Sequence, residues 1–322
     1  MGGTVEVPDG TCNKCNAEFG LAEAEIKEHT IILLTLLGIP NRYGVVPKAP
    51  MVANIRGLDM ENLTGFVDSA GNVKLHDVVR ESINESGQTL RQGFFITKEA
   101  GDKFAEREQN RNRGGRLIER EVPQRIVIDG TMTQTTPFAF FLTTRKVIAK
   151  IALAAIAYQY GKAFALSPYF DVLRDSRNAA NANDVPVRIF ANERLMEYNP
   201  RPAYQHSILC YLCAGTHKGF AIVTLFGGLT YIVFVSENYT ERESRQFSIF
   251  YDAQSRQRIN PVVLANEMTL IGHVLSPDTS KFEDRDAVGA QWFPVLAAFC
   301  EEKGYTAEKI QVSQETTQRQ TK

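Results

Sequence analysis

The chain begins with the stretch MGGTVEVPDGTCNKCNAEFG (residues 1–20), and the interpretation of all later segments depends on it. It contains a Cys-x-x-Cys pair, Cys12 and Cys15, followed directly by Asn16. Because two residues separate the thiols, both sulfurs can reach one metal ion across a tight turn. A structural zinc site takes four ligands, and this stretch supplies two of them. The sequence therefore predicts half of a zinc site at this end of the chain.

This stretch resembles the second half of an HNH endonuclease domain. The features that carry the resemblance are Gly2-Gly3, a short extended run at 5–7, the Thr-Cys-x-x-Cys-Asn motif of 11–16, and Phe19-Gly20. In that family an earlier Cys-x-x-Cys and a Glu/Asp-His dipeptide come first, and the two Cys pairs share a structural zinc in a ββα-metal (treble-clef) fold. The family's His activates water, and a His or Asn on the next helix holds a catalytic divalent metal.

By position, the resemblance implies that Cys12 and Cys15 are ligands of a structural zinc. It also implies that Asn16 is the catalytic residue that binds a divalent metal such as Mg²⁺. The partner would be DNA, and the reaction would be hydrolysis of a phosphodiester bond. The His-bearing strand is not found ahead of this motif in the 322 residues. We therefore expect an incomplete zinc site, and a chain that by itself is inactive or nearly so.

A rival alignment starts from Glu28-His29, which follows Cys15 at a spacing that also suits the first half of an HNH domain. That alignment needs a Pro soon after the His and a second Cys-x-x-Cys a few tens of residues later. Pro40 comes too late for this, and the next cysteine is Cys210. The pattern of 21–37 also predicts one helix, ended by glycine and proline, rather than a strand. We therefore expect His29 on the surface of a helix.

Composition sets broad limits on the chain. With 43% hydrophobic and 23% charged residues, it is typical of a globular protein rather than a disordered one. The formal net charge of -1 argues against a basic coat, so any nucleic-acid binding must depend on local patches. Five cysteines, an odd number, do not form a disulfide framework, and the first residues lack the apolar run of a signal peptide. These features favour the cytoplasm, with reduced thiols.

After a linker over 39–51, the pattern predicts a small β region and a charged helix. Residues 52–57 are expected to be extended, and 63–67 and 72–75 to form a hairpin around a Ser-Ala-Gly turn. A strand at 94–97 and a helix over 98–112 follow.

The most basic local stretch is 106–125. Arginine can bind phosphate in a bidentate manner, and a Gly-Gly turn lets the backbone come close. Four glutamates are interleaved and weaken the positive field, so a solvated helix end is the alternative. The candidate nucleic-acid contacts here are Arg111, Arg113 and Arg116.

The longest apolar segment, 138–161, predicts a central buried helix. Its three basic residues argue against a membrane span. Arg145 and Lys146 are the candidates for contact with a nucleic-acid backbone, and the alternative is that they are rim residues of a core helix. A further helix is expected over 164–175, and then a loop of small residues over 178–184.

From residue 185 the hydrophobic period changes to two and predicts an antiparallel meander. Its expected strands are 187–190, 206–214, 220–226, 229–236 and 246–251. Cys210 and Cys213 form a second Cys-x-x-Cys inside one strand, where positions three apart point to opposite faces. We therefore expect these thiols, like Cys300, to be buried rather than to share a metal. Helices over 261–274 and 286–303 complete the pattern.

The predicted fold class is α+β, with a partial treble-clef zinc knuckle and helix over 1–38, a mixed helical and antiparallel-sheet body over 39–312, and a disordered tail over 313–322. The first functional hypothesis is an HNH-family endonuclease acting on DNA. The second is a non-catalytic module that binds nucleic acid or a protein. The third hypothesis is an enzyme whose site lies in the body. The sequence of the body contains no nucleophile–base pair or phosphate loop that would support it.

Overall fold

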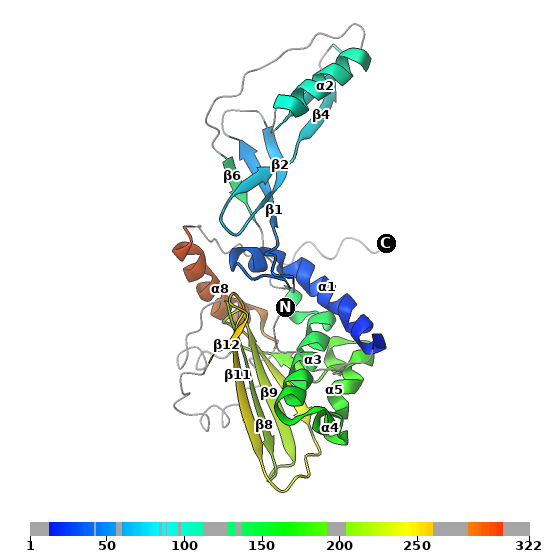
Figure 1. Ribbon diagram of the computed structural model, residues 1–322, viewed down its shortest axis with the longest axis vertical. Coiled ribbons are helices and arrows are strands. Elements are labelled where there is room, and N and C mark those ends of the chain that lie inside the picture. Colours follow the sequence, from blue (N-terminus) through cyan, green and yellow to red (C-terminus); the bar gives the residue numbers. More distant parts are fainter. Residues whose placement is uncertain are drawn as a thin grey trace. The chain divides into compact units, whose positions relative to one another are not determined.

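The computed structural model describes residues 13–41, 43–55, 60–83, 86–87, 89–95, 98–111, 128–132, 137–191, 204–259 and 283–304. The chain forms two compact units. Unit 1 comprises Met1–Thr30, Ile39–Val45 and Thr135–Lys322, and unit 2 comprises Ile31–Gly38 and Val46–Gln134. Both combine helices with antiparallel sheets, which confirms the predicted α+β class (Figure 1). The predicted helix at 261–274 and the tail at 313–322 lie outside the described residues, and the predicted division at residue 38 stays a prediction.

Helix α1 (Asn13–Leu36) was predicted but begins earlier than expected, inside the Cys-x-x-Cys motif. It ends where Gly38, at a φ of 63°, donates its N–H to the carbonyl of Thr35. Within unit 1 its residues Ala22 and Ile26 pack against Val147. Its last turn belongs to unit 2. No zinc knuckle is seen, because residues 1–12 lie outside the part of the chain that the structure describes.

Unit 2 contains a four-stranded antiparallel sheet of order β3-β2-β1-β6. Its strands are β1 (Ala49–Ile55), β2 (Met60–Val67), β3 (Val73–Leu75) and β6 (Ile128–Thr131). The β2–β3 hairpin confirms the predicted one, and its turn is held by the Asp68 carboxylate, which accepts the N–H groups of Ala70 and Asn72. Met51, Ala53 and Leu63 pack with Ile32 of the last turn of α1 to form the core.

A second hairpin in unit 2 was not predicted. Strands β4 (Val78–Ile83) and β5 (Thr89–Phe94) pair along their whole length, and α2 (Lys98–Arg111) follows as predicted. The predicted strand at 94–97 was misplaced, since β5 ends at Phe94; residues 96–97 lie outside the described part. The rings of Phe95 and Phe104 pack 4.9 Å apart between β5 and α2. A Cβ at Gly93 would lie 2.2 Å from the Phe95 ring, so a larger residue there requires that ring to shift.

The predicted helix over 138–161 is present as a 3-10 turn (Pro137–Phe140) followed by α3 (Leu142–Tyr160). The predicted helix over 164–175 is broken into α4 (Lys162–Ala165), a 3-10 turn and α5 (Asp171–Asp175). The break falls at Pro168, which has no N–H to continue a helical ladder. Helix α8 (Arg285–Glu302) confirms the prediction for 286–303.

Unit 1 also holds a six-stranded antiparallel sheet of order β12-β11-β8-β9-β10-β7. The strands are β7 (Val187–Ile189), β8 (Gln205–Cys213), β9 (Lys218–Leu225), β10 (Leu229–Ser236), β11 (Arg245–Asp252) and β12 (Gln257–Ile259). The predicted meander is correct for β8, β9 and β10 only. Strand β11 returns to pair with β8 instead of β10, which is the strand order of a Greek key.

Helices α3, α4 and α5 lie on one side of this sheet (Figure 1). The buried hydroxyl of Tyr231 on β10 donates to the carbonyl of Ala139, just before α3. From α8, the indole of Trp292 donates to the carbonyl of Phe226 in the β9–β10 turn. Among the described helices, none is long and apolar enough to cross a membrane.

Candidate functional site

The motif that resembles the HNH family lies at the start of α1. Cys12 lies outside the described residues, whereas the backbones of Cys15 and Asn16 belong to the first turn of the helix. Side chains are described only from Gly20 onward in this helix. The resemblance implies a metal-binding His or Asn on the helix that follows the Cys pair, and Asn16 has that backbone position.

His29, on which the rival alignment depends, lies in the second half of α1. It is exposed, and its ring makes an edge contact with Phe141 at 5.0 Å. The rival alignment requires a strand at this position, and α1 is helical throughout. The expectation of a helical surface residue is therefore confirmed.

The cysteines of the second Cys-x-x-Cys have different surroundings. Cys210 is buried in β8 as predicted, and burial raises the pKa of its thiol. Cys213 was also predicted to be buried but is partly exposed, and a hydrogen bond with the Thr216 side chain lowers the pKa of its thiol. Cys300 is buried, as expected. Within the described ranges, no group of three or more His, Cys, Asp or Glu residues could hold a metal ion.

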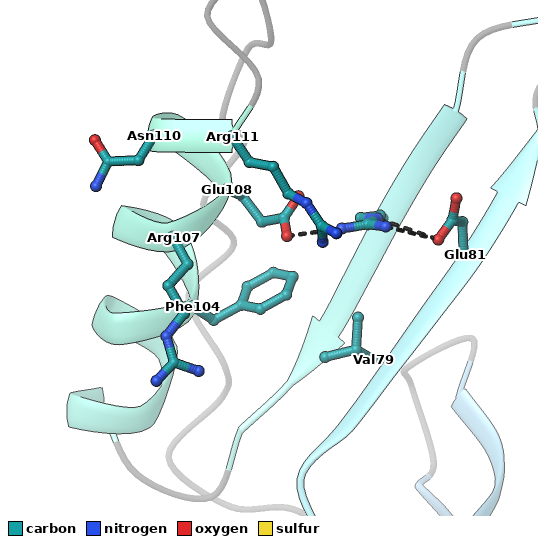
Figure 2. Close-up of a pocket in the computed structure, with 8 residues that line it drawn as sticks. Val79, Glu81, Phe104, Arg107, Glu108, Asn110 and Arg111 are labelled. Atoms are coloured by element: carbon teal, nitrogen blue, oxygen red, sulfur yellow. Dashed lines mark hydrogen bonds and ion pairs between the residues drawn. The ribbon is translucent and has the colours of Figure 1, made fainter.

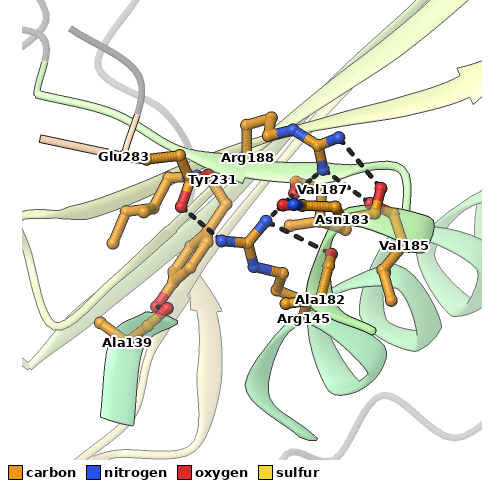
Figure 3. A network of polar contacts seen from close by, with 10 residues as sticks. Ala139, Arg145, Ala182, Asn183, Val185, Val187, Arg188, Tyr231 and Glu283 are labelled. Atoms are coloured by element: carbon orange, nitrogen blue, oxygen red, sulfur yellow. Dashed lines mark hydrogen bonds and ion pairs between the residues drawn. The ribbon is translucent and has the colours of Figure 1, made fainter. Parts of the chain in front are cut away.

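Arg145 is buried in unit 1, with 4% of its surface exposed. Its guanidinium donates to the carbonyl oxygens of Val187 (3.1 Å) and Ala182 (3.4 Å) and forms a salt bridge with Glu283. The other carboxylate oxygen of Glu283 accepts the N–H of Ile189 at 3.2 Å. Figure 3 shows the Arg145 guanidinium lying among Glu283, Ala182 and Val187. This placement argues against the predicted nucleic-acid contact, because the guanidinium faces the protein interior and not solvent.

Lys146, the neighbouring candidate, has a different position. It is partly exposed, and its ammonium group donates to the backbone carbonyl of Arg177 at 2.9 Å. One structural hydrogen bond leaves the other N–H donors of a lysine available. The prediction of a nucleic-acid contact at Lys146 therefore stays a prediction.

Unit 2 contains an open groove of about 730 Å³ between the β4–β5 hairpin and α2. Helix α2 and the hairpin supply its two walls (Figure 2). The lining residues are Val79, Glu81, Arg91, Phe104, Arg107, Glu108, Asn110 and Arg111. The candidate Arg111 is therefore part of a shaped site, whereas Arg113 and Arg116 lie outside the described residues.

Arg91 joins the two walls of this groove. From β5 it donates to the Glu81 carboxylate of β4 at 3.0 and 3.2 Å, and to the Glu108 carboxylate of α2 at 2.8 Å. These hydrogen bonds, the one to Glu108 foremost, raise the pKa of Arg91 above its ordinary value. Arg91 therefore fixes the hairpin to the helix and compensates both carboxylates.

Arg107 and Arg111 are the remaining cations of the groove. Both are exposed, and among the described residues neither forms a salt bridge. The groove could not be predicted from the sequence without its other wall, the β4–β5 hairpin. The available signal was weak: Val79, Glu81 and Ile83 alternate with other side chains before the Gly87 turn, but the strand is almost wholly exposed.

Comparisons with family models, with curated proteins and with solved structures each found no match to this chain.

Proposed function

We propose that this chain belongs to an HNH-type endonuclease and acts on DNA, with α1 as the helix that carries the metal-binding residue. The observation that supports the proposal is the start of α1 at Asn13, within the Thr-Cys-x-x-Cys-Asn motif. This start gives Asn16 the helical position that the resemblance to the family requires.

The donor types of the motif fit the two metals that such an enzyme would use. The thiolates of Cys12 and Cys15 suit a structural zinc, and the amide oxygen of Asn16 suits a hard cation such as Mg²⁺. When bound, the divalent metal supplies electrostatic stabilisation of the leaving oxygen. This chain's own part is to hold that cation through Asn16 and to bind the DNA. For the isolated chain we expect binding without measurable cleavage, because no His-bearing strand precedes the motif in its sequence.

The first test is to translate the DNA upstream of the Met1 codon. An in-frame Cys-x-x-Cys followed by a Glu/Asp-His dipeptide is the expected result. The extended protein should then nick plasmid in the presence of Mg²⁺, and Asn16→Ala should reduce the rate by at least about 100-fold. A stop codon directly upstream, or full activity in the Asn16→Ala variant, would contradict the nuclease proposal. Cleavage by the chain of residues 1–322 alone would contradict its expected inactivity.

The second candidate function is a non-catalytic nucleic-acid-binding module, and the α2 groove favours it. This function predicts binding that persists in EDTA and weakens steeply with salt, since phosphate contacts release counterions. Binding that requires a divalent metal, or that ignores salt, would count against it.

A further inference from the structure

We propose that the groove between α2 and the β4–β5 hairpin binds the phosphodiester backbone of DNA through Arg107 and Arg111. The choice of DNA as the partner rests on the proposed function, while the site itself rests on the geometry of unit 2. The groove shares no residue with the α1 motif, and no role follows for it from the resemblance to the HNH family.

The two arginines are neighbours on one face of α2. They are four residues apart on α2, so their side chains leave the same face of the helix, with about 5–6 Å between the two Cβ atoms. Figure 2 shows Arg111 extending from the end of α2 toward the hairpin and Arg107 lying beside Phe104. A planar guanidinium can donate two parallel hydrogen bonds to one phosphate, which a lysine cannot do.

Within the part of the chain that the structure describes, no carboxylate is paired with Arg107 or Arg111, so both can bind an anion. Its lining holds three arginines and two glutamates, a formal sum of +1. Arg91 contacts both Glu81 and Glu108, so one guanidinium already compensates much of the negative charge. Glu108 is also largely covered, with 17% of its side chain exposed, which limits its repulsion of an incoming phosphate. Glu81 keeps 56% of its side chain exposed but is paired with Arg91, so the exposed charge of the lining is two arginines against one paired carboxylate.

The helix that carries the arginines is held in a fixed position. Two contacts hold α2 against the hairpin: the packing of Phe95 on Phe104 and the hydrogen bond from Arg91 to Glu108. Asn110, between the two arginines in sequence, also lines the groove. Side chains that start from a rigid element lose less entropy on binding, so a preorganised pair binds more tightly than two arginines on a loose tail.

The apolar part of the groove defines the competing partner. Val79 is 49% exposed, and with Phe104 it gives the groove a hydrophobic floor. An acidic peptide could use such a floor together with the arginines. The charge pattern favours DNA, because the guanidinium groups stand exposed at the rim, and the peptide is an outcome that the test must separate.

The test measures the affinity of the whole chain for a fluorescein-labelled duplex and for a single strand of the same length, by polarisation over a series of salt concentrations in EDTA. The variants are Arg107→Gln/Arg111→Gln and Arg107→Lys/Arg111→Lys. The control is Lys103→Gln, which removes a charge from α2 outside the groove, where Lys103 is paired with Glu99 at 2.6 Å. Circular dichroism of each variant checks that α2 remains helical.

We expect the double Gln variant to bind at least about 10-fold more weakly, with a salt slope lower by about 1.4 for the single strand and about 1.8 for the duplex. The double Lys variant should recover part of the affinity, and Lys103→Gln should change it by less than about 2-fold. Equal losses in Lys103→Gln and the double Gln variant would overturn the site in favour of a diffuse charge effect. If the double Gln variant still binds DNA as strongly as the unmodified chain, the groove is not the binding site, although DNA remains the partner. No binding by the unmodified chain would overturn DNA as the partner in both proposals. In that case, a fluorescein-labelled acidic peptide that binds the unmodified chain but not the double Gln variant would identify the groove as a protein site.

Discussion

Arg145 allows the sharpest test of the structure, because a buried charge with an identified partner makes a quantitative prediction. Its salt bridge with Glu283 joins the start of α3 to a residue 138 positions later in the chain. The perturbation is a double-mutant cycle with Arg145→Met, Glu283→Gln and the two changes together. Methionine keeps the apolar volume of the arginine stem while it removes the charge.

The size of the effect follows from the exposure of the two partners. Breaking a buried pair from one side costs about 3–5 kcal/mol. Two features favour the lower end of that range. Glu283 keeps 32% of its side chain exposed, so water can solvate the carboxylate once Arg145 is gone. The Nε of Arg145 is buried without a partner among the described residues, and replacing Arg145 removes that cost. We therefore expect a loss of about 3 kcal/mol for Arg145→Met, and no smaller a loss for Glu283→Gln, which leaves the buried guanidinium without its carboxylate.

The pair should show strong coupling. The double variant leaves no uncompensated charge, so it should cost about as much as one single change, with a coupling energy of about 2–3 kcal/mol. The assay is urea unfolding followed by the fluorescence of Trp292, the chain's one tryptophan, which is buried in unit 1. For a loss of about 3 kcal/mol, the midpoint should fall by about 1–3 M urea.

Lys146→Met is the matched control, since it removes a charge one residue away whose hydrogen bond, to the Arg177 carbonyl, lies at the surface. It should cost less than about 1 kcal/mol. Additive losses in the double variant, or an Arg145→Met loss as small as the control, would refute the inference that Arg145 serves the interior of unit 1.

Two further predictions concern other parts of the chain. Burial lowers the pKa of His206 to about 4, and its Nδ1 accepts the N–H of Phe226, so the unfolded chain binds the proton more readily. The contribution of His206 to the free energy of unfolding should therefore be full above pH 6.5 and fall toward pH 4, by at most about 3 kcal/mol. In urea unfolding at several pH values, His206→Gln should weaken this dependence of stability on pH. An unchanged pH dependence in the variant would contradict the prediction. In unit 2, Gly93→Ala places a Cβ 2.2 Å from the Phe95 ring and should cost about 1–3 kcal/mol, seen as faster hydrogen exchange in α2 with no change in the Trp292 transition. Unaltered exchange in α2 would mean that the ring can move aside without cost.

What the sequence could predict was local. The β2–β3 hairpin was found because Asp68 and Gly71 are turn formers between alternating strands, and α2 because its apolar residues recur at helical spacing. The β4–β5 hairpin was missed because nearly every residue of β4 is exposed, so no hydrophobic pattern marks it. Its strands are held by backbone pairing and by cross-strand contacts such as Glu81 with Arg91. Such contacts become visible only when both strands are already known.

Long-range pairing explains the larger errors. Strand β11 pairs with β8 across two intervening strands, and a strand's own residues do not state which edge it will join. Arg145 was predicted to contact nucleic acid, or to lie at the rim of a core helix, because two lysines follow it within two helical turns. Its partner Glu283 is too distant in the sequence for any spacing rule to connect them. In both cases, the decisive contact joins two segments that are far apart in the sequence.

The two proposed sites belong to different compact units, and this allows them to be tested separately. The motif at 12–16 belongs to unit 1, where Trp292 reports on folding, while the groove residues Arg107 and Arg111 belong to unit 2. Substitutions in the groove should therefore leave the Trp292 transition unchanged, and Asn16→Ala should leave the salt slope of DNA binding unchanged in EDTA. If the groove variants lower DNA binding without moving the Trp292 transition, the loss arises at the groove itself. If instead both quantities move together, the affinity depends on the folding of the whole chain, and the assignment of DNA contacts to α2 fails even though DNA binding remains.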